Sequence, residues 1–121
     1  KTMNRTAILA ALASSILTSL GMWAFGFAGV SSTVKLENAK VKVTEMDYPP
    51  GTPRTRFTRQ GDQVIVFLDD SRYQRTDSQT QEKTIRTRKS GYVIWHNKGE
   101  DAPVLMNLGS KTYRTIVVEL K

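Results

Sequence analysis

The chain has 121 residues and a formal net charge of +7, from 18 lysines and arginines against 11 acidic residues, with no cysteine and one histidine. Its length leaves room for a single domain, and the absence of cysteine excludes disulfides, thiolate zinc sites and a cysteine nucleophile. With one histidine and no cysteine, a metal site of three imidazoles cannot be built within one chain.

The N-terminal part of the chain, residues 1–32, is an apolar leader. Two basic residues precede a run without charge over residues 7–30, and small residues lie at the end of that run. This order is typical of a secretory signal peptide, with cleavage after Ala28 or Ser32. We therefore expect a bacterial protein that is exported to the periplasm or secreted.

An uncleaved anchor is the alternative for this leader. Roughly 20 apolar residues can span a bilayer, and residues 7–30 reach that length. The protein would then stay attached to the inner membrane through this N-terminal segment alone. The many alanines, serines and glycines of the run make it weakly hydrophobic for a permanent span, which favours cleavage.

Residues 33–121 show short segments of alternating polar and apolar residues separated by turn residues, the pattern of β-strands. Val41–Met46 alternates in this way, and the prolines and glycine of Tyr48–Pro53 end the segment. Gln63–Leu68 is the most apolar segment, so we expect both of its faces to be covered, the outer one by the opposite sheet, the N-terminal strand or a second subunit. Arg54–Arg59 is expected to be a polar strand or an extended arm. The other expected strands are Val34–Leu36, Arg72–Arg75, Thr84–Arg88, Tyr92–Trp95, Val104–Leu108 and Tyr113–Leu120. About eight main strands and no helical period predict an all-β sandwich or barrel.

The predicted mature domain is basic. Without Lys1 and Arg5, 18 minus 2 leaves 16 basic residues against 11 acidic ones, a net charge of +5. Much of this charge lies in Arg54–Arg59 and Arg72–Lys89, where it alternates with threonine, serine and glutamine, which favours a solvated strand surface. A basic face can also bind an anionic lipid or polymer. We expect no nucleic acid as a partner, because the protein is predicted to be exported and no aromatic residues interleave with the arginines.

Two glycine-led segments of the domain have a recognisable spacing. After Gly51 come five residues, then Phe57-Thr58-Arg59, three further residues and Gln63, and a second segment runs over Gly91–Gly99. This spacing resembles the two signature motifs of the cupin superfamily. In that family the first motif supplies two histidines and a glutamate to a metal, and the second motif supplies a third histidine.

Both ends of the domain add to this resemblance. Leu36–Val43 resembles the entry strand of small single-domain cupins of the RmlC-like type, and Asn107–Lys121 resembles their closing strand. The resemblance implies a double-stranded β-helix, or jelly-roll barrel, over residues 33–121. It also implies a homodimer, because cupins commonly pair through sheet faces.

The positions that would bind the metal carry other residues. Phe57, Arg59 and Gln63 stand at the first three ligand positions, and Ala102 stands near the fourth. Phe57 and Ala102 cannot ligate anything, Arg59 carries a permanent positive charge, and Gln63 offers only a neutral oxygen. We therefore expect no metal and no cofactor, and neither a metal-dependent dioxygenase nor a metal-dependent isomerase.

Two interpretations of these altered positions remain. In one, Phe57 fills the space of the metal, while Arg59 and Gln63 point out of the barrel mouth and bind nothing. In the other, the barrel keeps a pocket for a small anionic molecule. Arg59 would hold a carboxylate or phosphate, Gln63 would orient it, and Trp95 would form an aromatic wall. The predicted function is accordingly a small-molecule-binding or structural module.

His96, the single histidine, suggests a rival function. Because histidine titrates near neutral pH, a metal-independent enzyme acting on a carbohydrate or carboxylate would use His96 together with Arg59 and Gln63. No serine or cysteine nucleophile is identifiable as its partner, and a lone loop histidine is more often a surface residue, so we assign no catalytic residue and keep His96 as a pocket candidate. A third alternative is an envelope-anchored protein whose basic face binds an anionic polymer or lipid.

Overall fold

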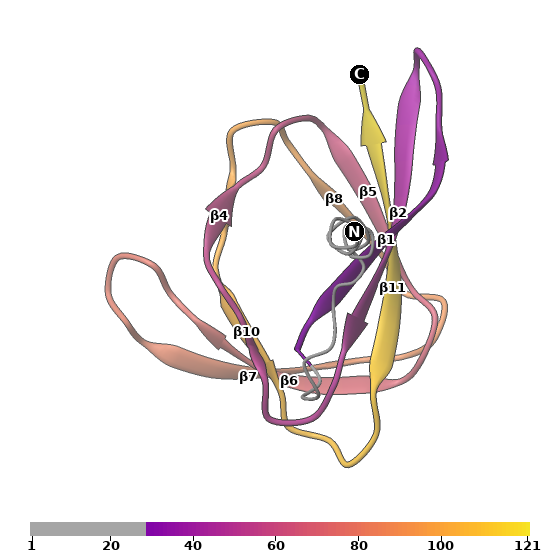
Figure 1. Cartoon of the computed structure of the whole chain (residues 1–121). Helices are drawn as coiled ribbons and strands as arrows, with labels where there is room; N and C mark the ends of the chain where they lie inside the picture. Colours follow the sequence, from indigo (N-terminus) through magenta and orange to yellow (C-terminus); the bar gives the residue numbers. More distant parts are fainter. Residues whose placement is uncertain (1–28) are drawn as a thin grey trace, which may run out of the picture.

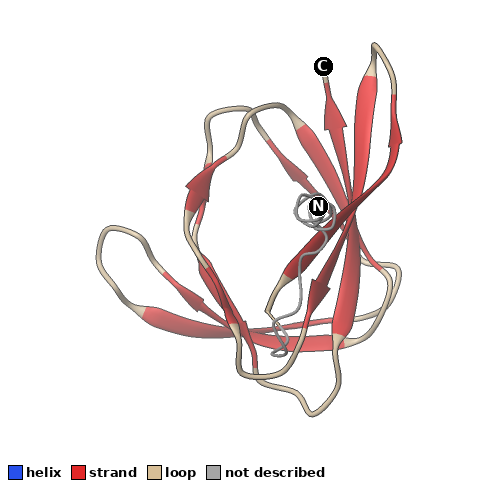
Figure 2. Cartoon of the chain, viewed as in Figure 1, coloured by secondary structure: helices blue, strands red, loops and turns tan. Residues whose placement is uncertain are grey.

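The computed structural model describes residues 29–121, and its elements there are all strands, as predicted (Figure 2). The strands are β1 (Ser31–Glu37), β2 (Val41–Tyr48), β3 (Pro53–Arg54), β4 (Phe57–Thr58), β5 (Gln63–Phe67), β6 (Ser71–Thr76), β7 (Lys83–Arg88), β8 (Val93–His96), β9 (Asp101–Ala102), β10 (Val104–Asn107) and β11 (Tyr113–Leu120). Three of these eleven described strands are two residues long, so eight longer strands remain, as the sequence indicated. Within residues 29–121, no helix is long and apolar enough to cross a membrane.

The strands form two antiparallel sheets that face each other (Figure 1). One sheet has the order β1-β2-β11-β5-β8 and the other β3-β10-β6-β7, while β4 and β9 pair with each other as a separate ladder. The last strand, β11, lies between β2 and β5, so that neighbours in the sheet come from distant parts of the chain. Such interleaving is the mark of a jelly roll.

Alternation along each strand decides which side chains enter the space between the sheets. In β5, Gln63, Ile65 and Phe67 are buried and face inward. Val64 and Val66 face outward and are only partly buried. Within the described residues the outer face of β5 is only partly covered, so its covering by a second subunit stays a prediction.

Aromatic rings make up most of the buried core between the two sheets. The rings of Tyr48 and Tyr113 stack with their centres 4.7 Å apart, and Phe67 lies 6.2 Å from Tyr73 and 6.1 Å from Tyr113. All four side chains are at most 5% exposed. Because they come from β2, β5, β6 and β11, their contact joins the two sheets.

Asn107, at the end of β10, is a buried polar residue whose side-chain amide nitrogen and oxygen are both hydrogen-bonded. It is 2% exposed, and its Nδ2 donates to the carbonyl oxygens of Tyr48 and Lys111, each at 2.8 Å. Its Oδ1 accepts a hydrogen bond from the backbone N–H of Gly109 at 2.7 Å. The side chain thus ties β2 to the turn between β10 and β11.

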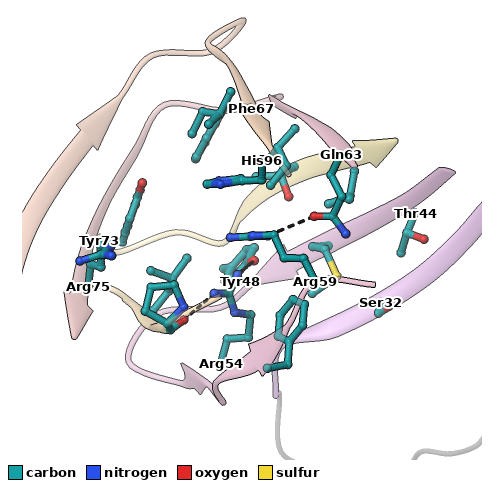
Figure 3. Close-up of a pocket in the computed structure, with 18 of the residues that line it drawn as sticks. Ser32, Thr44, Tyr48, Arg54, Arg59, Gln63, Phe67, Tyr73, Arg75 and His96 are labelled. Carbon is teal, nitrogen blue, oxygen red and sulfur yellow. Dashed lines mark hydrogen bonds between the residues drawn. The ribbon is translucent and has the colours of Figure 1, made fainter. Parts of the chain in front are cut away.

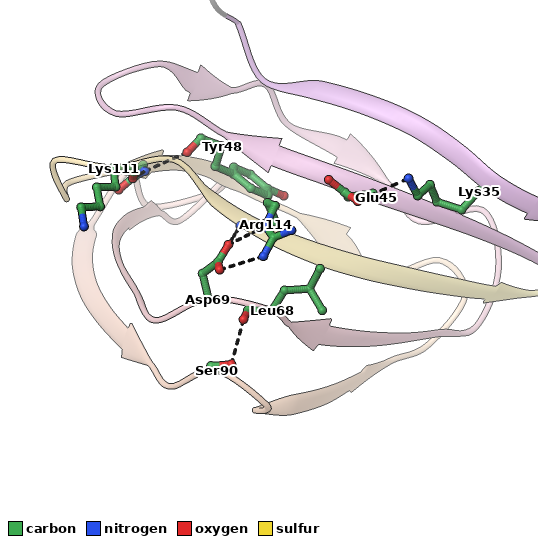
Figure 4. Close-up of polar contacts among 9 residues, drawn as sticks. Lys35, Glu45, Tyr48, Leu68, Asp69, Ser90, Lys111 and Arg114 are labelled. Carbon is green, nitrogen blue, oxygen red and sulfur yellow. Dashed lines mark hydrogen bonds and ion pairs between the residues drawn. The ribbon is translucent and has the colours of Figure 1, made fainter.

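Ion pairs join some of the charged groups on the outside of the barrel (Figure 4). The Arg114 guanidinium donates from Nε and Nη2 to the two oxygens of Asp69, at 2.8 and 3.0 Å. These hydrogen bonds hold the pKa of Asp69 below its usual value. Lys35 and Glu45 form a further pair across β1 and β2.

The start of the barrel lies slightly before the boundary that we expected at residue 33. β1 begins at Ser31, which pairs with Asp47, and Val30 packs against the core. Of the two predicted cleavage positions, the one after Ala28 leaves β1 whole. The rest of the predicted leader, residues 1–28, lies outside the described residues, so export and anchoring stay predictions.

Candidate functional site

A cavity of about 360 Å³ lies between the two sheets (Figure 3). Its apolar lining includes Ile65 and Ile94 from the five-stranded sheet and Tyr73 and Leu105 from the four-stranded sheet. Several polar side chains converge on the same space. An apolar hollow with a few convergent polar groups is the form that small-molecule sites usually take.

Arg59 and Gln63 lie together on the wall of this cavity (Figure 3). Nη1 of Arg59 donates to Oε1 of Gln63 at 3.1 Å, and Nε2 of Gln63 is 3.4 Å from Oε1 of Glu119. Arg59 is 5% exposed and Gln63 is 4% exposed. Both side chains therefore point into the barrel, and the interpretation that placed them outside its mouth is wrong.

The turn between Arg59 and Gln63 is held against the last strand. The backbone N–H of Leu120 donates to the carbonyl oxygen of Asp62 at 2.8 Å. Gly61 packs so closely there that a Cβ on it would lie 2.7 Å from the carbonyl oxygen of Leu120. Only glycine allows this approach of two backbones, so Gly61 helps to set where the two flanking side chains lie.

Arg54 is a second buried arginine, which the sequence analysis did not single out. It is 9% exposed, and its guanidinium donates to the Tyr48 hydroxyl at 3.0 Å and to the carbonyl oxygen of Pro103. Burial, and after it the nearby charge of Arg54, lowers the pKa of Arg59. Two guanidinium groups thus share one wall of the cavity and repel each other.

Phe57 and Ala102, two of the altered positions, lie opposite each other in the β4–β9 ladder. Ala102 is fully buried, whereas Phe57 is 40% exposed. The Phe57 ring centre lies 5.1 Å from Cζ of Arg54 and 5.8 Å from Cζ of Arg59, which allows cation–π attraction to both. Phe57 lines the cavity, but a volume of about 360 Å³ stays open beside its partly exposed ring, so the ring does not fill the space that a metal would occupy.

His96 lines the same cavity and stands directly opposite Gln63 in the β5–β8 register. Its Nδ1 lies 3.1 Å from Oε1 of Glu100. The backbone N–H of Asn97, followed by the His96 side chain, lowers the pKa of the Glu100 carboxyl group. This carboxylate partner could not be predicted from the sequence, because the turn that brings Glu100 back to His96 has no periodic pattern.

Trp95 corrects one of our expectations. It is 50% exposed, and its indole N–H donates to Oδ1 of Asn97 at 2.9 Å on the surface. The residues of β8 that line the cavity are Ile94 and His96, which flank Trp95 in the strand. Trp95 therefore faces outward and does not form the aromatic wall that we predicted.

Three further arginines, Arg75, Arg86 and Arg88, line the cavity from β6 and β7. We interpreted this basic segment as a solvated strand surface, which is wrong for these inward-facing side chains. The alternation of these arginines with other residues predicts that those of one strand share a face of the sheet. Alternation alone does not show which face is the inner one.

Unpartnered polar atoms gather around this cavity. In residues 29–121, eight buried side-chain nitrogen or oxygen atoms have no hydrogen-bond partner, and five of them belong to residues that line the cavity. These five are Nε of Arg54, Arg59 and Arg88, the Tyr113 hydroxyl and Oγ1 of Thr115. Buried polar groups are normally satisfied, so partners for these atoms would have to come from water or from a molecule bound in the cavity.

No protein-family model matches the chain, and no curated protein sequence matches it. Solved structures do match. A cupin domain from Bordetella pertussis Tohama I has a TM-score of 0.69 at 20% identity, covering 81% of this chain and 99% of that one. An RmlC-like cupin with a double-stranded β-helix from Methanocaldococcus jannaschii has a TM-score of 0.59 at 11% identity, covering 81% and 85%. This chain has the cupin fold.

The cupin fold that the sequence resemblance predicted is thus confirmed. The fold by itself does not identify an activity. A polyketide cyclase from Streptomyces resistomycificus also matches, with a TM-score of 0.60 at 16% identity, covering 79% of this chain and 70% of that one. At such identities a shared fold does not carry a shared activity, because one fold hosts many functions.

The residues of this cupin-fold domain do not fit the metal that the resemblance implies. The positions of the expected ligands hold a phenyl ring, a guanidinium, an amide already bonded to that guanidinium, and a methyl group, at Phe57, Arg59, Gln63 and Ala102. Within residues 29–121, no three histidine, aspartate or glutamate side chains gather as a metal site would require. The positive charges of Arg54 and Arg59 would also repel a divalent cation.

Proposed function

We propose that this cupin binds a small organic anion in the cavity, with a carboxylate or phosphate group held by Arg59 and oriented by Gln63. The observation that carries the proposal is the condition of Arg59, which is 5% exposed, bonded to a neutral amide, and left with an unpartnered Nε. A buried charge without a hydrogen-bonded counterion is costly. A bound anion would remove that cost and accept the short, charge-assisted hydrogen bonds that guanidinium groups form.

The surroundings of Arg59 support an anion over a neutral ligand. Arg54 adds a second positive charge to the same wall and lowers the pKa of Arg59, an effect larger than the opposite one of either nearby carboxylate, Glu100 or Asp101. Burial raises the pKa of the Tyr113 hydroxyl far above its usual value, so this unpartnered group stays neutral and can donate a hydrogen bond. The apolar lining accommodates an organic body behind the charged group.

The test compares two molecules of one shape, biphenyl-4-carboxylate and its neutral amide, biphenyl-4-carboxamide, by isothermal titration calorimetry. We expect the carboxylate to bind and the amide to bind much more weakly. The Arg59→Ala variant should lose about 2 kcal/mol of binding free energy for the carboxylate, roughly 30-fold in affinity, because one charged hydrogen-bond donor is removed.

The matched control is Arg114→Ala, which removes an arginine from the outer surface of the barrel, where it is paired with Asp69. This variant should bind the carboxylate as the unchanged protein does. Equal affinity of the Arg59→Ala variant and the unchanged protein would contradict the proposal and leave a structural module as the better description.

A further inference from the structure

The cavity has a second basic wall, opposite the one that holds Arg59. In the β6–β7 ladder, Arg86 stands opposite Tyr73 and Arg88 stands opposite Ser71. Residues directly opposite in an antiparallel pair share a face of the sheet. Because the buried Tyr73 ring faces the interior, both arginines lie on the inner face, and Arg75 lines the cavity beside them.

These arginines form no ion pair within the described residues, although Asp77 attracts Arg75. The described ion pairs use other basic groups, and Nε of Arg88 is buried without a hydrogen-bond partner. The carboxylates that line the cavity are engaged at the opposite wall. Glu100 contacts His96, Asp101 pairs with Arg56, and Glu119 accepts from Gln63.

The two basic walls are separated along β5. Gln63, at the start of this strand, contacts Arg59. Phe67, at its end, contacts the ring of Tyr92 at 6.2 Å, and Cζ of Arg88 lies 4.7 Å from the centre of that ring. Four residues of an extended strand span about 13 Å, so a single carboxylate or phosphate is too small to meet both walls.

Figure 3 shows Arg75 beside Tyr73 on one side of the view and Gln63 on the other. The surface between the two walls is apolar, and it includes Ile65 and Ile94. The cavity is therefore positive at two ends and apolar in the middle.

We propose that the ligand carries two anionic groups, one at each end of an apolar or aromatic body. One group binds Arg59 and Arg54, and the other binds Arg86 and Arg88. The proposal rests on the proposed function, since Arg59 holds one of the two groups. It goes further by stating that a molecule with a single anionic group is an incomplete ligand.

The experiment adds a third probe, biphenyl-4,4′-dicarboxylate, to the monocarboxylate used above. The two differ only in the second anionic group, and both are titrated into the 121-residue chain at one ionic strength, because salt screens charge interactions. We expect the dicarboxylate to bind at least tenfold more tightly than the monocarboxylate. In an Arg86→Ala/Arg88→Ala variant this preference should fall to about one, while the affinity for the monocarboxylate is retained.

Arg72→Ala is the matched control, because Arg72 is an exposed arginine of β6 that does not line the cavity. Its preference for the dicarboxylate should equal that of the unchanged protein. A preference that survives the double substitution, or that Arg72→Ala reduces equally, would overturn the second site. Equal binding of both probes by the unchanged protein would overturn it too while leaving the proposed function standing, whereas binding of neither probe would count against both.

Discussion

Asn107 and Arg59 are both buried polar residues of the same barrel, but they differ in how completely their side chains are hydrogen-bonded. Every hydrogen-bonding group of the Asn107 amide is matched by a backbone partner within 2.8 Å. Arg59 has one neutral side-chain partner and a buried Nε with none. Asn107 lies where β10 turns into β11, and Arg59 lies on the cavity.

The contrast separates two uses of buried polarity. A satisfied amide joins strands and belongs to the framework, since each of its bonds would be lost on unfolding. An unsatisfied guanidinium weakens the framework and is useful only if something else completes it. Stability measurements can therefore tell the two uses apart without any knowledge of the ligand.

Asn107→Ala should have the largest effect on stability. Three hydrogen bonds disappear, and at about 1 kcal/mol each the free energy of unfolding should fall by about 3 kcal/mol, which lowers Tm on the order of 10 °C. Chemical denaturation measures this loss. Asn38→Ala, in the exposed turn between β1 and β2, is the control and should cost clearly less. Equal losses in both variants would remove the distinction between Asn107 and an ordinary turn residue.

The next largest expected effect concerns dimer formation through the outer face of the five-stranded sheet. Val93 and Trp95 are 57% and 50% exposed there, and the partly buried Val64 and Val66 lie beside them in the β5–β8 register. We expect a homodimer in which a second copy covers this apolar face. A Val93→Ser/Trp95→Ser variant should raise the dimer dissociation constant by about 30-fold or more, because large aromatic side chains dominate such contacts.

Sedimentation equilibrium at micromolar concentration measures this dimer. Ile85→Ser is the control, since Ile85 is an equally exposed apolar residue on β7, in the other sheet. A monomeric mass for the unchanged protein, or equal dissociation of the control variant, would leave Trp95 as an isolated surface residue and end the dimer prediction.

Arg59→Met should have the smallest effect on stability. Methionine keeps the apolar stem of the side chain and removes the buried charge, so we expect the free energy of unfolding to stay within about 1 kcal/mol of the original value or to rise. The same denaturation experiment applies. A loss as large as that of Asn107→Ala would mean that Arg59 holds the barrel together, and the contrast between the two residues would fail.

The strands were predictable from the sequence because alternation and turn residues mark them directly. The spacing from Gly51 to Gln63 also pointed to the altered positions around Arg59, which do lie on the cavity. The burial of Arg54 could not be predicted, because β3 is only two residues long and shows no alternating pattern. Arg86 and Arg88 needed knowledge of which face of β7 is inward, and alternation is the same for both faces.

Trp95 was predictable but was placed on the wrong face. We assigned both Trp95 and His96 to the pocket, although adjacent residues of a strand point to opposite faces. The register places His96 opposite Gln63, which faces inward, so Trp95 has to face outward. The partnership of His96 with Glu100 depends on the turn at residues 97–100, whose shape comes from tertiary hydrogen bonds such as that from Lys98 to Asp62.

The close packing of Gly61 separates two kinds of substitution in the site: those at residues 59 and 63, and those at residue 61 itself. Because its backbone is pressed against Leu120, the directions in which residues 59 and 63 project belong to the scaffold and not to the side chains themselves. Substitutions at residues 59 and 63 can therefore change which ligand is bound, while the new side chains still project in the same directions. An alanine at residue 61 would do the reverse, leaving every binding group chemically intact and redirecting Arg59 and Gln63.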